Sequence, residues 1–346
     1  MHVSTILVTG GAGFIGSHTC LSLLHSGYRV VVIDNLCNSS IEAIKRVEEL
    51  AGSRIRFIEG DVKDAALMDN LFSGNDIDAV IHFAGLKSVN ESVEMPLAYY
   101  NNNIGATFTL LQAMQTHGVK KIVFSSSATV YGNPRFNPIP ETASLHQSNP
   151  YGRCKRIIEQ ILEDIQIADN SWHIAILRYF NPVGAHPSGR IGEDPIGIPN
   201  NLFPYIARVV GGKLEKLQIY GNDYPTPDGT GIRDYIHITD LAWGHIKAIE
   251  QLQTKQGCGI YNLGTGKGYS VMDVLKTFET VVGKPIPFQI VDRRPGDVAA
   301  CFANPAKAKQ ELNWEATHGL EEMVRDTVNW QKANPDGYKA IKPDHG

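Results

Sequence analysis

No apolar run in this 346-residue sequence approaches the roughly 18 residues that a membrane-spanning helix needs. No recognisable signal peptide precedes its first strand-like run, Ile6-Leu7-Val8, so we expect a cytoplasmic protein without a membrane anchor. Basic residues are not in excess: the formal net charge is -4 and the isoelectric point is about 6.3. Because this balance gives no positive field for a phosphate backbone, we expect no nucleic-acid partner.

Cysteine is scarce and irregularly spaced. The five cysteines include no CxxC pair, which is the spacing typical of structural zinc sites. His82 and His237 have no carboxylate or cysteine at ligand spacing, so we expect both to be packed and hydrogen-bonded. The sequence therefore predicts reduced thiols and no catalytic metal.

Short β-branched runs alternate with longer helical patterns in the first half of the chain. The strand-like runs are Ile6–Val8, Val30–Ile33, Ile55–Ile58, Ala79–Phe83, Ile122–Phe124 and Ile174–Leu177. Apolar residues at helical spacing predict one helix over Tyr100–His117, and another is expected to begin at Pro150 or Tyr151. The alternation is typical of βαβ units, so we predict an α/β fold with a Rossmann-type parallel sheet flanked by helices.

The pattern changes after Arg178. Residues 181–200 are rich in proline and glycine and predict a loop or a set of turns at a domain boundary. Helices are expected beyond it at Leu202–Val210, Leu241–Leu252 and Val271–Val282, and strands at Leu217–Tyr220, Ile260–Leu263 and Phe288–Val291. We therefore predict a first domain over residues 1–180, to which a segment near 235–265 returns, and a smaller discontinuous α/β domain mainly over residues 181–346.

A glycine-rich segment follows the first strand-like run and opens a helical pattern. It reads TGGAGFIG over residues 9–16 and places Gly10, Gly13 and Gly16 three residues apart. Glycines in this context allow a tight turn and let backbone N–H groups at a helix N-terminus bind a pyrophosphate. Asp34 ends the second strand-like run, where its carboxylate can accept hydrogen bonds from both ribose hydroxyls and would repel a 2′-phosphate. The segment predicts a dinucleotide site that favours NAD over NADP.

Tyr151 and Lys155 are four residues apart and share one face of the expected helix. A nearby ammonium and a cationic nicotinamide ring both favour the phenolate, so we expect the pKa of Tyr151 to move down from about 10 toward the operating pH. The run Ser125-Ser126-Ser127 ends the fifth strand, at the carboxyl edge where open α/β sheets bind ligands. These residues predict an enzyme that moves a hydride with a tyrosine as its acid and base.

Beyond these residues, the chain resembles the UDP-glucose 4-epimerases of the extended short-chain dehydrogenase/reductase group. The resemblance runs from about Ile6 to Trp330 on the motifs TGGAGFIGSH, VVIDNL, FAGLKSV, SSSATVYG, NPYGRCK, LRYFNPVGAHPSG, GTGIRDYIH and RRPGD. It implies interconversion of UDP-glucose and UDP-galactose through a 4-keto sugar, with NAD tightly bound as a prosthetic group. It also implies that Ser127 hydrogen-bonds the sugar hydroxyl, that Tyr151 is the acid/base, and that Lys155 holds the nicotinamide ribose and tunes the tyrosine.

The resemblance also implies the binding residues of both ligands. Cofactor contacts are expected from Gly10, Gly13, Phe14, Ile15, Gly16, Asp34, Asn35, Asn38, Ser39, Asp61, Val62, Phe83, Ala84, Gly85, Lys87, Asn102, Tyr151, Lys155 and Tyr179. Substrate contacts are expected from Lys87, Ser127, Tyr151, Phe180, Asn181, Asn201, Leu202, Gln218, Tyr220, Arg233, Arg294, Asp297 and Cys301. Guanidinium groups such as those of Arg233 and Arg294 suit a diphosphate, while Tyr220 can cover the uracil and Asp297 can bind a ribose hydroxyl.

The sequence departs from the family pattern at two places. Residues 102–107 read NNIGAT where the family usually has NNVNGT, which puts in doubt only what the missing asparagine contributes. Cys301 stands where the family has a tyrosine four residues after the RRxGD motif, beside the C2 substituent of the sugar. Because cysteine is smaller, we expect UDP-N-acetylglucosamine and UDP-N-acetylgalactosamine also to be interconverted. The alternative is that neighbouring side chains fill this space around a small buried residue.

Two other functions stay open beside the epimerase. A 4,6-dehydratase would need a carboxylic acid pair beside the catalytic serine or threonine, and Ser127-Ala128-Thr129 supplies none. A non-catalytic NAD sensor would not need Tyr151, Lys155 and Ser127, and only turnover excludes it. The helices at about Tyr100–His117 and Tyr151–Ile167 resemble those that pair across family dimers, which implies a homodimer.

Overall fold

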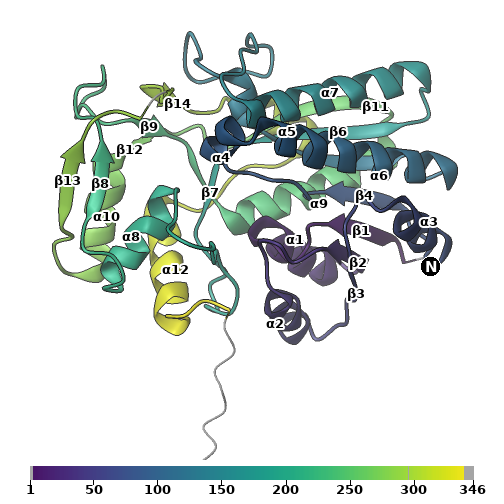
Figure 1. Cartoon of the computed structure of the whole chain (residues 1–346), viewed down its shortest axis with the longest axis horizontal. Coiled ribbons are helices and arrows are strands. Elements are labelled where there is room, and N and C mark those ends of the chain that lie inside the picture. Colours follow the sequence, from purple (N-terminus) through teal and green to yellow (C-terminus); the bar gives the residue numbers. More distant parts are fainter. Residues whose placement is uncertain (1–2, 295, 339–346) are drawn as a thin grey trace, which may run out of the picture.

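Seven parallel strands form one sheet within the residues that the structure describes, 3–294 and 296–338 of a computed structural model (Figure 1). The strands are β1 (Thr5–Thr9), β2 (Arg29–Asp34), β3 (Arg56–Glu59), β4 (Ala79–His82), β5 (Lys121–Ser127), β6 (His173–Tyr179) and β11 (Gly257–Leu263). Their order in the sheet is β11-β6-β5-β4-β1-β2-β3. Between β1 and β4 the direction of the winding reverses, which creates the crevice where doubly wound sheets bind ligands. The predicted Rossmann-type α/β fold is confirmed.

Helices cover both faces of this sheet because strand residues alternate between the faces. In β1, Ile6 and Val8 belong to one apolar core and Leu7 to the other, and all three are fully buried. One face is covered by α1 (Phe14–His25), α2 (Ile41–Ala51) and α9 (Ile238–Thr254), and the other by α3 (Ala65–Ser73), α6 (Gly105–Thr116) and α7 (Pro150–Ala168). The helix predicted from Pro150 begins at that residue, with the Asn149 side chain accepting a hydrogen bond from the Gly152 N–H.

The helix predicted over Tyr100–His117 is present, but its first turn is not a regular α-helix. After α4 (Val89–Glu94) and α5 (Pro96–Tyr99), residues Tyr100–Ile104 form a π-helical turn, and regular α6 begins only at Gly105. The Asn103 amide, 2 % exposed, donates to the Leu86 carbonyl at 3.0 Å and accepts from the Leu86 N–H at 2.8 Å. The apolar periodicity of the sequence did not reveal this π-helical turn. Its Asn103 side chain bonds Leu86, 17 residues away, and such a distant contact leaves no periodic signal.

A smaller lobe is built from the later part of the chain. Its core lies between α8 (Leu202–Val210), α10 (Val271–Val282) and α12 (Leu320–Ala333), beside the parallel pair β8 (Leu217–Tyr220) and β13 (Phe288–Val291). A three-stranded sheet joins β12 (Tyr269–Ser270), β9 (Ile232–Arg233) and β14 (Ala300–Cys301), and α11 (Ala306–Leu312) follows it. This small sheet places residues far apart in the sequence, Arg233 and Cys301, directly opposite each other.

The segment predicted as a loop after Arg178 contains a short strand. β7 (Asn181–Val183) pairs in parallel with β10 (Tyr235–His237), and this pair connects the two lobes of Figure 1. From there the chain returns to the large sheet through α9 and β11, and β11 pairs with β6 along its whole length.

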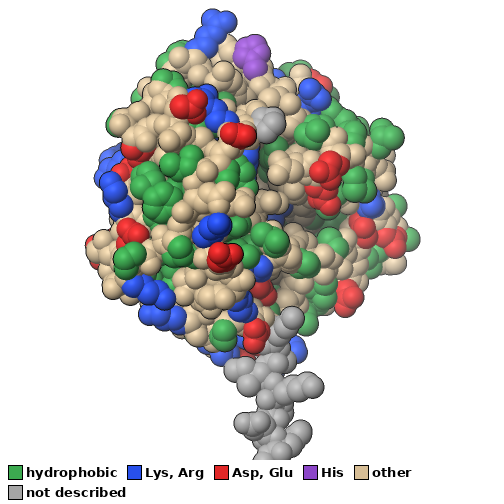
Figure 2. Space-filling model, turned by 60° about the vertical axis from the view of Figure 1, so that its left-hand side comes forward, with side chains coloured by type: hydrophobic (Ala, Val, Ile, Leu, Met, Phe, Trp, Pro, Cys, Tyr) green, Lys and Arg blue, Asp and Glu red, His purple; other side chains and the backbone are tan. Residues whose placement is uncertain are grey.

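The described part of the chain has no helix that is long and apolar enough to cross a membrane. Figure 2 shows acidic and basic side chains interspersed over the face in view. A mixed surface of this kind gives no continuous field of one sign on that face.

Candidate active site

The glycine-rich turn lies at the switch point of the sheet, between the ends of β1 and β4. Gly10 has a φ of +70°, and a Cβ there would lie 2.8 Å from the Ala84 nitrogen. A Cβ on Gly16 would lie 2.3 Å from the Gly10 carbonyl oxygen. Both positions therefore require glycine, because any side chain would push the turn away from β4 or from α1. Gly13 caps α1 without a side-chain hydrogen bond, and the first turn of α1 carries no acidic residue. Its N–H groups suit an anion such as a pyrophosphate.

Asp34 is fixed at the end of β2, beside this turn. Its carboxylate accepts hydrogen bonds from the Ala12 N–H at 3.0 Å, the Leu36 N–H at 2.9 Å and the Ser39 hydroxyl at 2.8 Å. These donors leave further lone pairs of the carboxylate for a ligand such as a ribose diol. Five of the expected cofactor residues, Gly13, Phe14, Asn38, Ser39 and Lys87, line one crevice here.

Ser127, Tyr151 and Lys155 come together at the carboxyl end of β5. The Ser127 side chain lies close enough to the Tyr151 phenol to lower its pKa, and the Ser127 hydroxyl accepts hydrogen bonds from the Thr129 N–H at 3.2 Å and the Thr129 hydroxyl at 3.0 Å. The Lys155 ammonium lies 5.7 Å from the Tyr151 ring centroid and donates to the Ser125 carbonyl at 2.6 Å. Helix α7 and strand β5 therefore present a hydroxyl, a phenol and an ammonium to one point at the sheet edge.

The pKa of Tyr151 does not shift in the predicted direction in the protein alone. Burial raises the pKa of Tyr151 to about 12, and the Ser127 side chain beside it only partly opposes this. Burial lowers the pKa of Lys155 to about 8, because an ammonium is costly to remove from water. The prediction rested on the charge of Lys155 and left out the desolvation of the phenol, which is larger.

The sequence analysis did not predict a buried ion pair beside the expected catalytic residues. Arg178 on β6 donates to both oxygens of Glu159 on α7, at 2.9 and 2.8 Å, and both residues are at most 1 % exposed. The Ser126 hydroxyl donates to the same carboxylate at 2.6 Å. Glu159 lies one helical turn beyond Lys155, so this pair fixes α7 against the strand end that carries Ser127.

His245 is a second residue that the sequence analysis missed. Its Nδ1 lies 2.8 Å from the Leu241 carbonyl and its Nε2 lies 2.5 Å from the Tyr179 hydroxyl. Because a ring nitrogen beside a carbonyl must carry the proton, Tyr179 donates to Nε2. The His245 ring also packs on Phe83, with ring centroids 4.9 Å apart. His245 thus orients two expected cofactor residues, and it was missed because it shows its role only through this contact.

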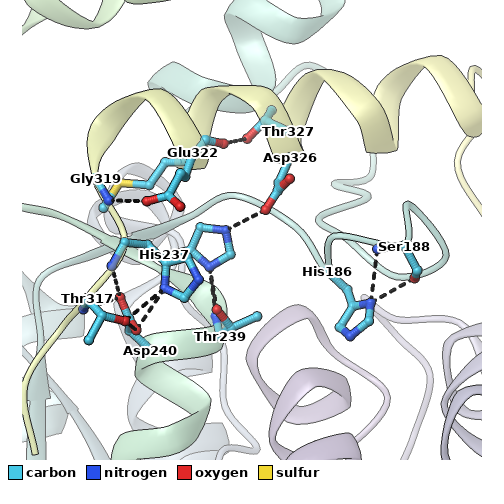
Figure 3. A network of polar contacts seen from close by, with 12 residues as sticks. His186, Ser188, His237, Thr239, Asp240, Thr317, Gly319, Glu322, Asp326 and Thr327 are labelled. Atoms are coloured by element: carbon cyan, nitrogen blue, oxygen red, sulfur yellow. Dashed lines mark hydrogen bonds and ion pairs between the residues drawn. The ribbon is translucent and has the colours of Figure 1, made fainter.

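His82 and His237 are packed and hydrogen-bonded, as predicted. His82 bonds the hydroxyls of Thr9 at 2.7 Å and Thr107 at 3.0 Å, and burial lowers its pKa to about 3. Figure 3 shows His237 between Thr239, at 2.7 Å, and Asp326 on α12, at 3.2 Å. Across the described residues, no group of three or more potential ligands could hold a metal ion.

The expected substrate residues of the smaller lobe form two sets of contacts. The Arg233 guanidinium donates to the Val298 carbonyl at 2.8 Å and lies 3.5 Å from the Asp297 carboxylate. Arg294 stacks over the Tyr220 ring at 3.8 Å from its centroid, and the Tyr220 hydroxyl donates to Gln218 at 2.8 Å. In this structure Arg294 covers the aromatic face that was expected to cover uracil.

Cys301 lies opposite Arg233 in the small sheet and packs against the apolar cluster that contains Phe180 and Tyr131. It is partly buried, and burial raises the pKa of its thiol to about 11. The thiol therefore stays neutral near pH 7.

The other expected residues lie around these groups. In the larger lobe, Ile15 and Ala84 pack on the two apolar cores and Val62 is buried. Asp61 forms an ion pair with Lys63, Asn35 accepts from the Cys37 N–H, and both Gly85 and Asn102 contact Asn103. In the smaller lobe, Asn181 begins β7, Asn201 is the N-cap residue of α8 beside Glu193, and Leu202 begins α8. Glu193 itself was not predicted, although its carboxylate lies 3.8 Å from the Lys87 ammonium.

Comparison with known proteins identifies the family. Residues 7–327 match the family model described as GDP-mannose 4,6 dehydratase. The chain is 62 % identical over 337 residues to the UDP-glucose 4-epimerase of Bacillus subtilis, covering 97 % of this chain and 99 % of that protein. The chain belongs to the UDP-glucose 4-epimerase family. The mouse UDP-glucose 4-epimerase is 54 % identical over 342 residues, with 97 % and 99 % covered.

Solved structures of UDP-glucose 4-epimerases share this fold closely. The Bifidobacterium longum epimerase, in complex with NAD+ and UDP, superposes with a TM-score of 0.94 at 55 % identity, covering 96 % of this chain and all of that one. The UDP-Glc/GlcNAc 4-epimerase of Campylobacter jejuni has a TM-score of 0.84 at 34 % identity, with 95 % and 99 % covered. These four relatives are all named as epimerases, which favours that activity over the dehydratase.

Proposed function

We propose that this protein interconverts UDP-glucose and UDP-galactose by inverting C4 of the sugar, with NAD as a retained cofactor. The observation that carries the proposal is the meeting of Ser127, Tyr151 and Lys155 at the sheet edge, beside a glycine turn in which Gly10 and Gly16 leave no room for a side chain. The high identity to named epimerases supports the same activity.

The residues present fit NAD. The uncapped N-terminus of α1 would bind the pyrophosphate, Asp34 the adenosine ribose, and Lys155 the nicotinamide ribose. When bound, NAD accepts the hydride from C4, returns it, and adds a positive charge beside the phenol. That charge would oppose the effect of burial on Tyr151 and favour its phenolate, beside the Lys155 ammonium 5.7 Å from the ring centroid.

Tyr151 and Ser127 would manage the proton of the sugar. The phenol oxygen takes the proton from the 4-hydroxyl as the 4-keto sugar forms, and gives it back to the 4-oxygen on either face of the ring. Ser127 lies beside this phenol, so its hydroxyl can hydrogen-bond the sugar while the phenol exchanges the proton. The nucleotide stays bound by Arg233, Arg294 and Asp297 while the keto sugar turns over.

Retention of NAD gives the first test. Purified protein is expected to convert UDP-galactose without any added NAD, because the cofactor is regenerated in every turnover. The measurement is a coupled assay for UDP-glucose on desalted protein. Complete dependence on fresh NAD, with release of one NADH for each substrate, would contradict the proposal.

The pH dependence gives the second test. Burial lowers the pKa of Lys155 to about 8, so its ammonium is present below this pH and lost above it. We expect kcat to fall as the pH rises through about 8. In Lys155→Arg, which stays charged, this fall is expected to move to higher pH although the rate is lower throughout. The same midpoint in both proteins, measured as kcat over a pH range of about 6 to 10, would assign the fall to another group.

We propose that Cys301 leaves room for an acetamido group on C2 of the sugar. The chain is expected to interconvert UDP-N-acetylglucosamine and UDP-N-acetylgalactosamine, and Cys301→Tyr to suppress this by about 1–3 kcal/mol, or roughly 5- to 150-fold, while sparing the plain hexoses. The related C. jejuni structure is named for both substrates, which supports this reading.

The assay compares kcat/KM for all four nucleotides. Cys37→Tyr, at an exposed cysteine, is the matched control and is expected to leave the ratio between the two substrate pairs unchanged. Absence of N-acetylhexosamine turnover where UDP-galactose is rapidly consumed would contradict the proposal.

A homodimer in the cytoplasm completes the proposal. Helices α6 and α7 expose Phe108, 50 % accessible, and Ile167, 78 % accessible, which supports pairing of these helices between two copies. The five cysteines are unpaired, which supports a reducing compartment. Light scattering at micromolar concentration tests the dimer, and a monomer mass would contradict it.

A further inference from the structure

The segment over residues 189–196, called the strap below, lies along the cofactor crevice. Its residues Gly192 to Ile196 line the crevice together with Gly13, Phe14 and Ser39. The Glu193 carboxylate lies 3.8 Å from the Lys87 ammonium and is hydrogen-bonded to Asn201. The strap therefore connects the mouth of the NAD site to the smaller lobe.

The strap is held by the segment Trp330 to Tyr338, whose last residue, Tyr338, also lines the crevice. The Tyr338 hydroxyl donates to the Gly192 carbonyl at 3.1 Å and accepts from the Gly192 N–H at 3.0 Å. The Tyr338 N–H donates to the Asp194 carboxylate at 2.8 Å. The Trp330 indole donates to the Glu193 carbonyl at 3.0 Å. Three consecutive strap residues are thus bound by two aromatic side chains and one amide.

These two segments pack without space for an added side chain. A Cβ on Gly192 would lie 2.5 Å from the Trp330 ring, and a Cβ on Gly337 would lie 2.1 Å from the Asp194 carboxylate. Gly337 also has a φ of +70°, a conformation that favours glycine. Glycine at positions 192 and 337 therefore allows the segment 330–338 to contact the strap closely.

Arg46 on α2 ties both segments to the NAD-binding lobe. Its guanidinium lies over the rings of Tyr338, at 5.2 Å, and Trp330, at 6.0 Å. It donates to the Asn334 side chain at 2.6 Å and to the Arg190 carbonyl of the strap at 3.1 Å. Arg46 is 6 % exposed, so these contacts form away from water, where they are stronger than on a surface.

We propose that residues 330–338 act as a clasp that keeps the strap closed over the cofactor crevice and so slows release of NAD, with Tyr338 as its main positioning residue. This inference rests on the proposed function, because it places NAD in the crevice. Tyr338 acts through its hydrogen bonds to Gly192 and Asp194 of the strap.

The test is NAD release from the purified holoenzyme of Tyr338→Phe. This substitution keeps the ring under Arg46 and removes the hydroxyl that bonds Gly192. Loss of this pair of hydrogen bonds is expected to increase the rate of NAD release about tenfold. The rate is measured by dilution and rapid ultrafiltration with absorbance of the released nucleotide, and separately as a loss of activity that added NAD reverses.

Tyr28→Phe is the matched control, since Tyr28 lies in the turn between α1 and β2 of the same lobe. It is expected to release NAD at the wild-type rate. Trp330→Phe, which removes only the indole donor to Glu193, is a second variant in case Tyr338→Phe does not fold, and is expected to speed release in the same direction. If both variants fold and retain NAD as long as the wild type, the clasp is refuted. If no nucleotide purifies with the wild type, the cofactor part of the proposed function fails instead.

Discussion

Replacing Tyr151 with phenylalanine is expected to lower turnover of UDP-galactose about a thousandfold or more. Phenylalanine keeps the ring near the Lys155 ammonium and removes the phenol oxygen, which is the proposed acid and base. Without this oxygen, no group at the carboxyl end of β5 is placed to accept the proton of the 4-hydroxyl. Because the ring volume is nearly conserved, the fold and the NAD content are expected to survive.

The measurement is a single-turnover assay with matched protein that has been checked for bound NAD by absorbance. Tyr131→Phe tests whether any lost tyrosine hydroxyl in this region has the same effect. Tyr131 is buried near the same strand end, where its hydroxyl donates to Asn262 at 2.6 Å and accepts from Arg178 at 3.0 Å, and neither partner is Tyr151 or Lys155. We expect Tyr131→Phe to reduce stability with a much smaller effect on turnover. Near-wild-type turnover of Tyr151→Phe would refute the proposed mechanism.

Local spacing made part of this site predictable from the sequence. Gly10, Gly16 and Asp34 belong to one βαβ unit, and their roles follow from where a strand ends and a helix begins. Tyr151 and Lys155 share a helix face for the same reason. The parallel sheet could be predicted because its strands are buried on both faces and appear as continuous β-branched runs.

The parts that the sequence did not reveal depend on contacts between distant segments. Glu159 looks like an ordinary helix-surface residue until Arg178, nineteen positions later, is placed opposite it by β6. His245 and Glu193 have roles only through Tyr179 and Lys87. The pKa of Tyr151 shows the same limit, because its burial depends on packing that helical spacing does not describe.

Removing Arg178 is expected to destabilise the fold more than loss of any surface ion pair. In Arg178→Leu the Glu159 carboxylate would stay buried, with only the Ser126 hydroxyl and the partly exposed Arg156 near it. Leaving a buried charge without its partner costs about 3–5 kcal/mol of the free energy of unfolding. We expect this loss in urea unfolding of the holoenzyme, and a lower activity in the remaining folded fraction because α7 loses its fixed position against β5.

A double variant separates the buried charge from the loss of packing. In Glu159→Leu/Arg178→Leu no charge is left unpaired, so most of the lost stability is expected to return, because a buried ion pair is often no more stabilising than apolar residues of similar size. Arg325→Leu is the surface control: Arg325 pairs with Glu321 at 2.8 Å, but both side chains are at least half exposed, and its loss is expected to cost at most about 1 kcal/mol. Equal losses in Arg178→Leu and in the double variant would show that packing, and not the isolated carboxylate, determines the stability at this position. The double variant can also recover stability without recovering turnover. That result would show that the ion pair positions α7, because activity would then depend on the orientation that Glu159 gives to α7 and Ser126.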